Sequence, residues 1–438
     1  MNGLLIRRAE LDGRTADVRV RAGLVTEIGE LRPVAAEMVI DARGGALLPG
    51  LHDHHLHLLS MAAAAISVRC GPPDVADLDG LARALREAPR TWVRGIGYHE
   101  SVAGVLDRHA LDRLVADRPV RVQHRTGGLW MLNTRALIEL GLLDEYDDGR
   151  LWRADALLGE RLGEQEPLDL AAVGRRLASL GITGITDATP ELSEGTIRLL
   201  AGGALPQRLH LLGAPLGARL PLGVTIGPWK ILPPDHKAPE WDTLHAEVLH
   251  VHATGRPVAI HAVTRESLVV ALAVLAQAGT VTGDRIEHAA IMGRDLLPML
   301  SQVGPVVVTQ PGFITERGDQ YRRDVPEADH ADLYRYASLL NSGVKAVASS
   351  DAPFASEDPW RIIAAAATRD LAPAERVTPR QVLDGLLTPL NDPGSAPRRI
   401  TVGGPADLCL LHVPLVEALS APHAGQVATT VCRGRLCT

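Results

Sequence analysis

The two ends of the chain alternate apolar and polar residues in short bursts. Near the start the bursts read LLIRRAEL, ADVRVRAG, LVTEIGEL and EMVIDARG, and glycine, aspartate or proline separates them. The same texture returns near the end, in PADLCLLHV and ATTVCRGRL. A period of two predicts β-strands, and chain termini often lie near each other. We therefore expect one small β-sandwich domain built from residues 1–48 and 391–438.

Between these ends, in residues 49–390, short apolar runs alternate with longer amphipathic stretches. In chain order the apolar runs are LHDHHLHL, VRVQH, ITGITDA, GPWKIL, RPVAIHA, DRIEHAA, GPVVVTQ and VKAVASSDAP. Repeated pairs of a buried strand and a helix form parallel sheets. Eight pairs predict an α/β fold whose main domain is a (β/α)8 TIM barrel. In that fold, catalytic residues lie at the C-terminal ends of the strands.

Composition and charge exclude several classes of protein. The 438 residues carry a net charge of −7, so the chain has no basic stripe for nucleic acid. The apolar run 58–68 is too short to span a membrane, and the N-terminal segment lacks a signal-peptide core. The cysteines show no C-x-x-C spacing, which is typical of reduced thiols: Cys70, Cys409, Cys432 and Cys437. We expect a cytoplasmic protein that acts on a small molecule, without nucleic-acid or membrane partners. A homo-oligomer is compatible with the sequence.

The most informative stretch is PGLHDHHLHL, at residues 49–58. On a strand, residues i and i+2 point to one face, so His55 and His57 can converge on one metal ion. His52 and His54 then face the other way, as packing or supporting groups. A purification tag or a solvated histidine run is the alternative, but this run is internal and follows an apolar stretch with a Pro-Gly turn. One strand supplies at most half of a zinc shell, so partners must come from elsewhere.

Other residues with ligand chemistry stand at the ends of later predicted strands. They are Lys230 on the fourth, His261 on the fifth, His288 on the sixth and Asp351 on the eighth. A single such residue is more often a helix cap or a satisfied polar group. Several strand ends of this kind in one barrel favour a metal centre.

Several longer motifs carry a family resemblance. They are VIDARGGALLPGLHDHHLHL, AIHA, RIEHA, SSDAP and GGPADLCLLHV, and together they resemble the amidohydrolase superfamily of metal-dependent hydrolases over nearly the whole chain. WVRGIGYHE, GGLWMLNTRAL, SLGITGITDAT and LLNSGVKAVASSDAPF are similar to the YtcJ-like branch, which includes N-substituted formamide deformylases.

The resemblance implies a role for each strand-end residue. His55 and His57 would bind the more buried metal with Asp351, and His261 and His288 would bind a second one. Lys230 would be carboxylated and bridge the two ions, since a desolvated lysine can add carbon dioxide. A salt bridge beside Trp229 is the alternative for this lysine. We expect one or two divalent ions per chain, two being favoured and Zn²⁺ the default, although manganese, iron or cobalt would also fit.

The same resemblance implies a hydrolase that cleaves a C–N bond of a small molecule, in an amide, an N-formyl or N-acyl group or a carbamate. A metal-activated water would be the nucleophile. Asp351 would be the general base, with His288 as a second catalytic residue. His124, Arg125, Trp130 and Arg317 are candidate substrate-binding residues. For Arg317, solvated surface charge is the alternative.

Two other functions compete with this hypothesis. The first is a mononuclear deaminase of the same superfamily. Those enzymes usually place a glutamate three residues after the fifth-strand histidine, where this chain has Thr264. The second is a non-catalytic metal-binding scaffold, which would be expected to lack the general base. Asp351 is present, which disfavours the scaffold.

Overall fold

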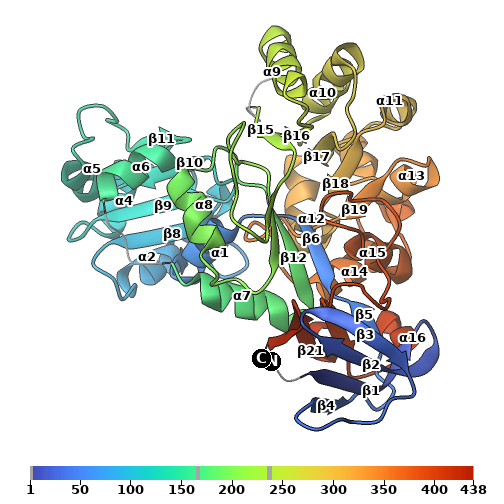
Figure 1. Ribbon diagram of the computed structural model, residues 1–438. Coiled ribbons are helices and arrows are strands. Elements are labelled where there is room, and N and C mark those ends of the chain that lie inside the picture. The colour runs from blue at the N-terminus through green and yellow to red at the C-terminus, as the bar shows by residue number, and fades with distance from the viewer. Residues whose placement is uncertain (1–2, 164–167, 234–238, 438) are drawn as a thin grey trace. The chain divides into compact units, whose positions relative to one another are not determined.

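The computed structural model describes residues 3–163, 168–233 and 239–437. The chain forms two compact units (Figure 1). Unit 1 comprises Met1–Leu58 and Leu170–Thr438, and unit 2 comprises Leu59–Asp169. Unit 2 is therefore an insertion within the range expected to form the barrel. Each unit is described by itself below.

Two four-stranded sheets of unit 1 are built from the chain ends. In spatial order, the first is β3 (Leu24–Gly29), β2 (Arg14–Arg21), β1 (Leu4–Leu11) and β4 (Met38–Asp41). The second is β22 (Arg435–Cys437), β21 (Val427–Cys432), β20 (Leu408–Leu411) and β5 (Leu47–Pro49). Antiparallel pairing of β20 with β5 joins the two ends of the chain directly. One hydrophobic cluster contains residues of both sheets, including Ile6, Val18 and Leu408, because their alternating apolar residues face the same core.

Two further sheets of unit 1 are entirely parallel. One has the order β14 (Val224–Ile226), β13 (Arg208–Leu211), β12 (Ile182–Asp187) and β6 (Leu51–Leu56). The other has the order β15 (Trp229–Ile231), β16 (Val258–Ala262), β17 (Arg285–His288), β18 (Val306–Thr309) and β19 (Ala346–Ala348). Most of their strands are buried, as expected for parallel strands covered on both faces, but β14 is largely exposed.

Backbone hydrogen bonds connect the edges of the two parallel sheets. The amide of Asp351, just after β19, donates to the carbonyl of His55 on β6 at 2.8 Å. The amide of His57 donates back to Ala352 at 2.9 Å. The amide of Lys230 on β15, the other edge strand of the five-stranded sheet, donates to Leu212, just after β13 of the four-stranded sheet, at 3.3 Å. These bonds bring the C-terminal ends of β6 and β19 together.

Helices follow most of the parallel strands. The helices of unit 1 are α7 (Leu170–Ser179), α8 (Glu194–Ala201), α9 (Trp241–Ala253), α10 (Arg265–Ala278), α11 (Leu297–Val303), α12 (Gly312–Asp324), α13 (Tyr336–Asn341), α14 (Pro359–Thr368), α15 (Pro379–Leu386) and α16 (Leu415–Ser420). Two of them begin with a capping box, α10 at Thr264 and α15 at Thr378, where side chains satisfy the free amides of the first turn. No helix among the described residues is long and apolar enough to cross a membrane.

Unit 2 contains one mixed five-stranded sheet. Its spatial order is β11 (Arg150–Trp152), β10 (Leu129–Leu132), β9 (Val120–His124), β8 (Val93–Tyr98) and β7 (Val68–Arg69). Its helices are α1 (Leu58–Ala65), which starts at the unit boundary, α2 (Leu78–Arg86), α3 (Glu100–Ala103), α4 (Arg108–Leu114), α5 (Thr134–Leu140) and α6 (Asp155–Leu162). Val93, Val120 and Val122 belong to one hydrophobic cluster, and Trp130 and Leu132 belong to another.

One strand assignment from the sequence was wrong. VRVQH, expected as the second barrel strand, is β9, and it pairs with β8 and β10 in unit 2. Instead, β13 (RLHL) stands beside β12 in a parallel sheet of unit 1. The pattern concealed β13 because it is only four residues long and leads into β14 and β15 without a helix between them, in a stretch that is described throughout. The sequence-based count of eight strand-helix pairs therefore included VRVQH, which belongs to unit 2, and omitted β13 of unit 1.

Candidate metal centre

The end of β6 presents two histidines to one carboxylate. His55 lies on the strand and His57 follows its last residue. The Nε2 atoms of His55 and His57 lie 3.5 and 3.3 Å from Oδ1 of Asp351. Possible ligand atoms of these three residues all lie within 4.8 Å of one another. The structure thus brings together the predicted histidine pair and the predicted base, although metal binding by them remains a prediction.

His288 and His261 lie next to this group. The rings of His261 and His288 are 4.5 Å apart, and the rings of His55 and His288 are 4.8 Å apart. Strand register pairs His261 with Glu287, so alternation alone would turn His288 to the opposite face. His288 instead has a φ of 73°, in the left-handed region. This backbone turn brings its imidazole beside His261, and its Nδ1 lies 3.9 Å from Oδ2 of Asp351.

Three of these histidines are held through Nδ1. His55 Nδ1 donates to the Glu287 carboxylate in a very short contact, and His57 Nδ1 lies 3.1 Å from the Thr189 hydroxyl. His288 Nδ1 lies 2.8 Å from Oε1 of Gln310. A proton on Nδ1 suits all three partners, and it leaves the lone pair on Nε2. Oriented Nε2 atoms of this kind are typical of metal-ligating histidines.

A buried ion pair between Arg285 and Glu287 holds His55 through its Nδ1 atom. Arg285 Nε donates to Oε1 of Glu287 at 2.7 Å, and Arg285 Nη2 donates to the backbone carbonyl of His54 at 2.8 Å. Arg285 and Glu287 are 1% and 0% exposed. Burial alone would raise the pKa of Glu287, but Arg285 and His55 outweigh it and lower that pKa well below its usual range. Glu287 is therefore an anion that fixes the orientation of the His55 ring.

Burial and neighbouring charge keep His55 and His288 neutral. Burial lowers the pKa of His55 to about 4, and the charge of Lys230 acts in the same direction. The pKa of His288 is lowered well below its usual value, first by burial and then by His261. The pKa of Asp351 is also lowered, because the facing His57, His55 and His288 outweigh its burial, and this carboxyl group is therefore ionised. Neutral imidazoles and an ionised carboxylate are the forms that bind divalent metals.

Lys230 lies on β15 with its side chain 5% exposed. Lys230 pairs with Ala259 in the ladder of β15 and β16, and Ala259 pairs with Arg285 in the ladder of β16 and β17. Lys230 and Arg285 therefore lie on the same face of the sheet. The charge of Lys230 contributes to the lowered pKa values of His55, Glu287 and His288. Lys230 is thus part of the same electrostatic cluster, whereas its carboxylation stays a prediction.

The candidate substrate-binding residues are divided between the two units of the chain. His124, Arg125 and Trp130 belong to unit 2, where His124 Nε2 lies 3.0 Å from Glu100 Oε2 and Trp130 is buried. Arg317, on α12 in unit 1, donates to the carbonyl of Phe354, and its guanidinium lies 4.4 Å from the Phe313 ring centre. The Phe354 ring in turn packs edge-on against His57 at 5.5 Å. Arg317 therefore braces the loop that follows Asp351.

Sequence reasoning missed three residues that hold the histidines: Glu287, Gln310 and Thr189. Gln310 follows the almost entirely apolar strand β18, and Glu287 is a charged residue within the buried strand β17, signals that could have been used. Their partners lie far away in sequence or depend on the turn at His288, so spacing alone does not reveal them.

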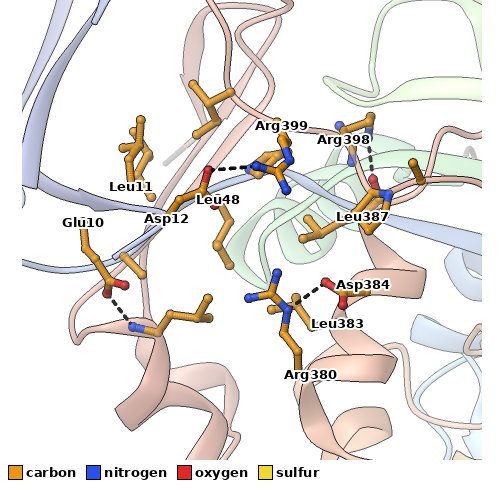
Figure 2. Close-up of a pocket in the computed structure, with 17 residues that line it drawn as sticks. Glu10, Leu11, Asp12, Leu48, Arg380, Leu383, Asp384, Leu387, Arg398 and Arg399 are labelled. Atoms are coloured by element: carbon orange, nitrogen blue, oxygen red, sulfur yellow. Dashed lines mark hydrogen bonds and ion pairs between the residues drawn. The ribbon is translucent and has the colours of Figure 1, made fainter. Parts of the chain in front are cut away.

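A separate cavity in unit 1 takes no part in this cluster. It measures about 310 Å³ and lies among the terminal strands, α15 and residues 396–400 (Figure 2). Its arginines are already used: Arg380 pairs with Asp384, Arg399 with Asp12, and Arg398 donates to the Leu387 carbonyl. It contains none of the predicted site residues.

Comparison with known proteins shows the family of this chain. The family model described as "Amidohydrolase family" matches residues 38–437. This chain belongs to the amidohydrolase family. The predicted resemblance is confirmed, as is the prediction of an enzyme that hydrolyses carbon–nitrogen bonds other than peptide bonds.

Two curated relatives align with most of this amidohydrolase. The N-substituted formamide deformylase of Arthrobacter pascens is 26% identical over 87% of this chain and 88% of its own length. A protein named amidohydrolase YtcJ, from Bacillus subtilis strain 168, is 22% identical over 84% of this chain and 83% of its own. Among solved structures, an uncharacterized metal-dependent hydrolase from Pyrococcus horikoshii OT3 superposes with a TM-score of 0.75 at 19% identity, covering 96% of this chain and all of that one. This similarity confirms the TIM-barrel-like α/β fold.

Proposed function

We propose that this amidohydrolase cleaves the C–N bond of an N-formyl or N-acyl amide, or of a related carbamate, in a small molecule. The observation that carries the proposal is the state of Asp351. Its Oδ1 atom is buried and makes no hydrogen bond to the described residues, and it faces the Nε2 atoms of His55 and His57. A buried carboxylate oxygen among imidazole nitrogens whose other ends are held fits a cation.

The donor set fits one or two divalent ions of the zinc type. His55, His57 and Asp351 would hold the first, and His261 and His288 would hold the second with a carboxylated Lys230 between the ions. When bound, such ions polarise the scissile carbonyl and acidify water. Support comes from the tight grouping of His55, His57 and Asp351 and from the adjacent rings of His261 and His288.

The chain's own residues would provide positioning and proton transfer. Asp351 is ionised, so it can accept a proton from the attacking water and later return it to the leaving amine. Glu287 and Gln310 fix the rings of His55 and His288. Arg317 holds the carbonyl of Phe354, and so restrains the loop beside His57.

We also infer the finer architecture that this mechanism requires. The backbone bonds between β6 and the end of β19, and between β15 and the end of β13, support closure of the two parallel sheets into one barrel. The shared hydrophobic cluster of the two terminal sheets supports a β-sandwich. The residues expected at the strand ends would then surround one mouth of the barrel.

The structure disfavours the deaminase alternative. Thr264 stands where a catalytic glutamate is expected, and its side chain caps α10 by accepting from the amide of Ser267. A threonine hydroxyl is far too weak an acid to replace a carboxyl group as the proton donor to a substrate ring, and here it donates to the Ser267 hydroxyl at 3.2 Å.

The test is a panel of N-substituted formamides, N-acetyl amines, carbamates and amino-substituted heteroaromatic rings, assayed with the zinc-loaded protein. Release of an amine with formate or another carboxylate is expected. Ammonia released only from the heteroaromatic compounds would overturn the proposal in favour of deamination. Metal content near two ions per chain would agree with the second site.

A further inference from the structure

Two arginines of unit 2 lie directly opposite each other. Arg94 on β8 and Arg121 on β9 are register partners in the parallel ladder, so their side chains leave the same face of the sheet. Like charges in directly opposed positions destabilise a sheet. This pair therefore needs a compensating partner.

An indole ring supplies only part of the compensation. The guanidinium carbons of Arg94 and Arg121 each lie 5.4 Å from the ring centre of Trp130 on β10. Trp130 is 2% exposed, and its Nε1 donates to Oδ1 of Asp155 at 3.1 Å. The ring attracts both cations through its π electrons, but it carries no net charge.

Hydrogen-bond acceptors are missing around the two guanidinium groups. Arg94 and Arg121 are half-buried, and neither guanidinium group makes a hydrogen bond or ion pair within the described residues. Arg94 Nε is buried without a partner. Arg118 of the same unit shows how this chain normally satisfies such a group, because it donates to the backbone carbonyls of Leu85, Arg86, Ala88 and Arg90.

The local charge balance is positive. Burial lowers the pKa of both arginines, that of Arg121 to about 10, and the charge of Arg94 adds to the shift at Arg121. Asp155 is the carboxylate whose charge opposes these effects. Two guanidinium groups and one carboxylate leave a net charge of +1, which one monoanion would neutralise.

We propose that Arg94, Arg121 and Trp130 form a binding site in unit 2 for the carboxylate group of a small molecule. A planar carboxylate matches the fork of a guanidinium group and would give the two arginines their missing acceptors. A phosphate dianion would reverse the local charge and leave one negative charge in excess. The site is independent of the histidine cluster and of the reaction proposed for it.

Acetate is the simplest probe, and thermal unfolding of the metal-loaded protein is the measurement. A ligand that binds the folded state raises the unfolding midpoint as its concentration increases. We expect sodium acetate to produce a saturable rise of a few degrees, beyond that of sodium chloride at the same ionic strength. Equal effects of acetate and chloride would overturn the proposal. Saturation with inorganic phosphate but not with acetate would overturn the assignment to a carboxylate.

Two variants of Arg121 and one control variant locate the effect. Arg121→Gln should remove the acetate response without lowering the midpoint in chloride, because it relieves the repulsion from Arg94. Arg113→Gln is the matched charge control on the exposed surface of α4, and it should respond to acetate as the natural protein does. Arg121→Lys, which keeps the charge but loses the planar fork, should raise the half-saturating acetate concentration several-fold. An unchanged response in Arg121→Lys and Arg121→Gln would place acetate elsewhere and refute the site.

Discussion

The two faces of β6 carry the same residue type and serve different purposes. On one face, His52 Nδ1 donates to the carbonyl of Thr388 at 2.8 Å, and His54 Nε2 lies 3.0 Å from the Thr388 hydroxyl. On the other face and just beyond the strand, His55 and His57 bond through Nδ1 and direct Nε2 to Asp351.

The difference lies in the partners rather than in the histidines. His52 and His54 are tied to the segment that follows α15, and burial lowers their pKa values, that of His54 to about 3. They behave as neutral core residues. His55 and His57 face an ionised carboxylate whose own hydrogen bonds are incomplete. Substitutions on the two faces should therefore separate activity from stability.

The largest effect is expected from Asp351→Asn. Asparagine keeps the shape of the side chain but cannot accept the proton, so kcat should fall by about 10²–10⁴-fold. Metal content, measured in parallel by elemental analysis, should be largely retained. Normal turnover would remove Asp351 as the general base.

Lys230→Ala tests the role of the Lys230 side chain beside the histidine cluster. We expect the metal content to fall, above all at the second site, together with the loss of a carbon dioxide adduct from the native intact mass. Lys230→Met is the control for side-chain volume and should behave like the alanine variant. Two retained ions with full activity would exclude the bridging role.

Glu287→Gln tests the support of His55. Glutamine is nearly isosteric but uncharged, and removal of a carboxylate behind a metal-ligating histidine typically weakens metal affinity by about 10–100-fold. Competition with a coloured chelator measures that affinity without reference to turnover, and circular dichroism checks the fold. Unaltered affinity would show that Glu287 only balances the charge of Arg285.

His52→Gln tests the opposite face. The ring fills the space beside Gly184 and bonds to Thr388, so its loss should lower the free energy of unfolding by about 1–3 kcal/mol. Turnover per bound metal should stay unchanged. A loss of turnover at full metal content would mean that the two faces are not separate.

The same variant should alter the pH dependence of stability by a smaller amount. The pKa of His52 is lowered by burial in the folded state, so below pH about 6.5 the unfolded chain binds the proton more readily. Its contribution to stability is therefore complete above that pH and is lost as the pH falls. Denaturant titrations between pH 7 and 5 should show a slope reduced by up to about 1.4 kcal/mol per pH unit in His52→Gln. An unchanged slope would mean that His52 is already charged in the folded protein.

Periodicity predicted this separation on β6 correctly, because the alternation of a strand is a local property. It also identified the residues at the ends of β15, β16, β17 and β19. It did not predict the turn at His288, where a φ of 73° overrides the alternation. The role of Glu287 was also hidden, since its partner His55 is on another strand.

The insertion explains the remaining errors. VRVQH has the composition of a buried strand, and nothing local distinguishes a strand of unit 2 from one of unit 1. The opposed arginines became visible only through strand register, because Arg94 and Arg121 are far apart in the sequence. Long-range pairing of this kind cannot be derived from residue spacing.

The antiparallel pairing of β5 with β20 also constrains how the protein is made. On the ribosome, Leu47–Pro49 emerges before unit 2 and the strands β12 to β19, whereas Leu408–Leu411 emerges only after them. Unit 2 is contiguous in the chain and can fold while translation continues, but the edge of β5 must wait for its partner until β20 has been synthesised. A nascent chain stalled before β20 would expose the unpaired edge of β5. Chaperones would then have to protect the N-terminal strands until β20 pairs with them.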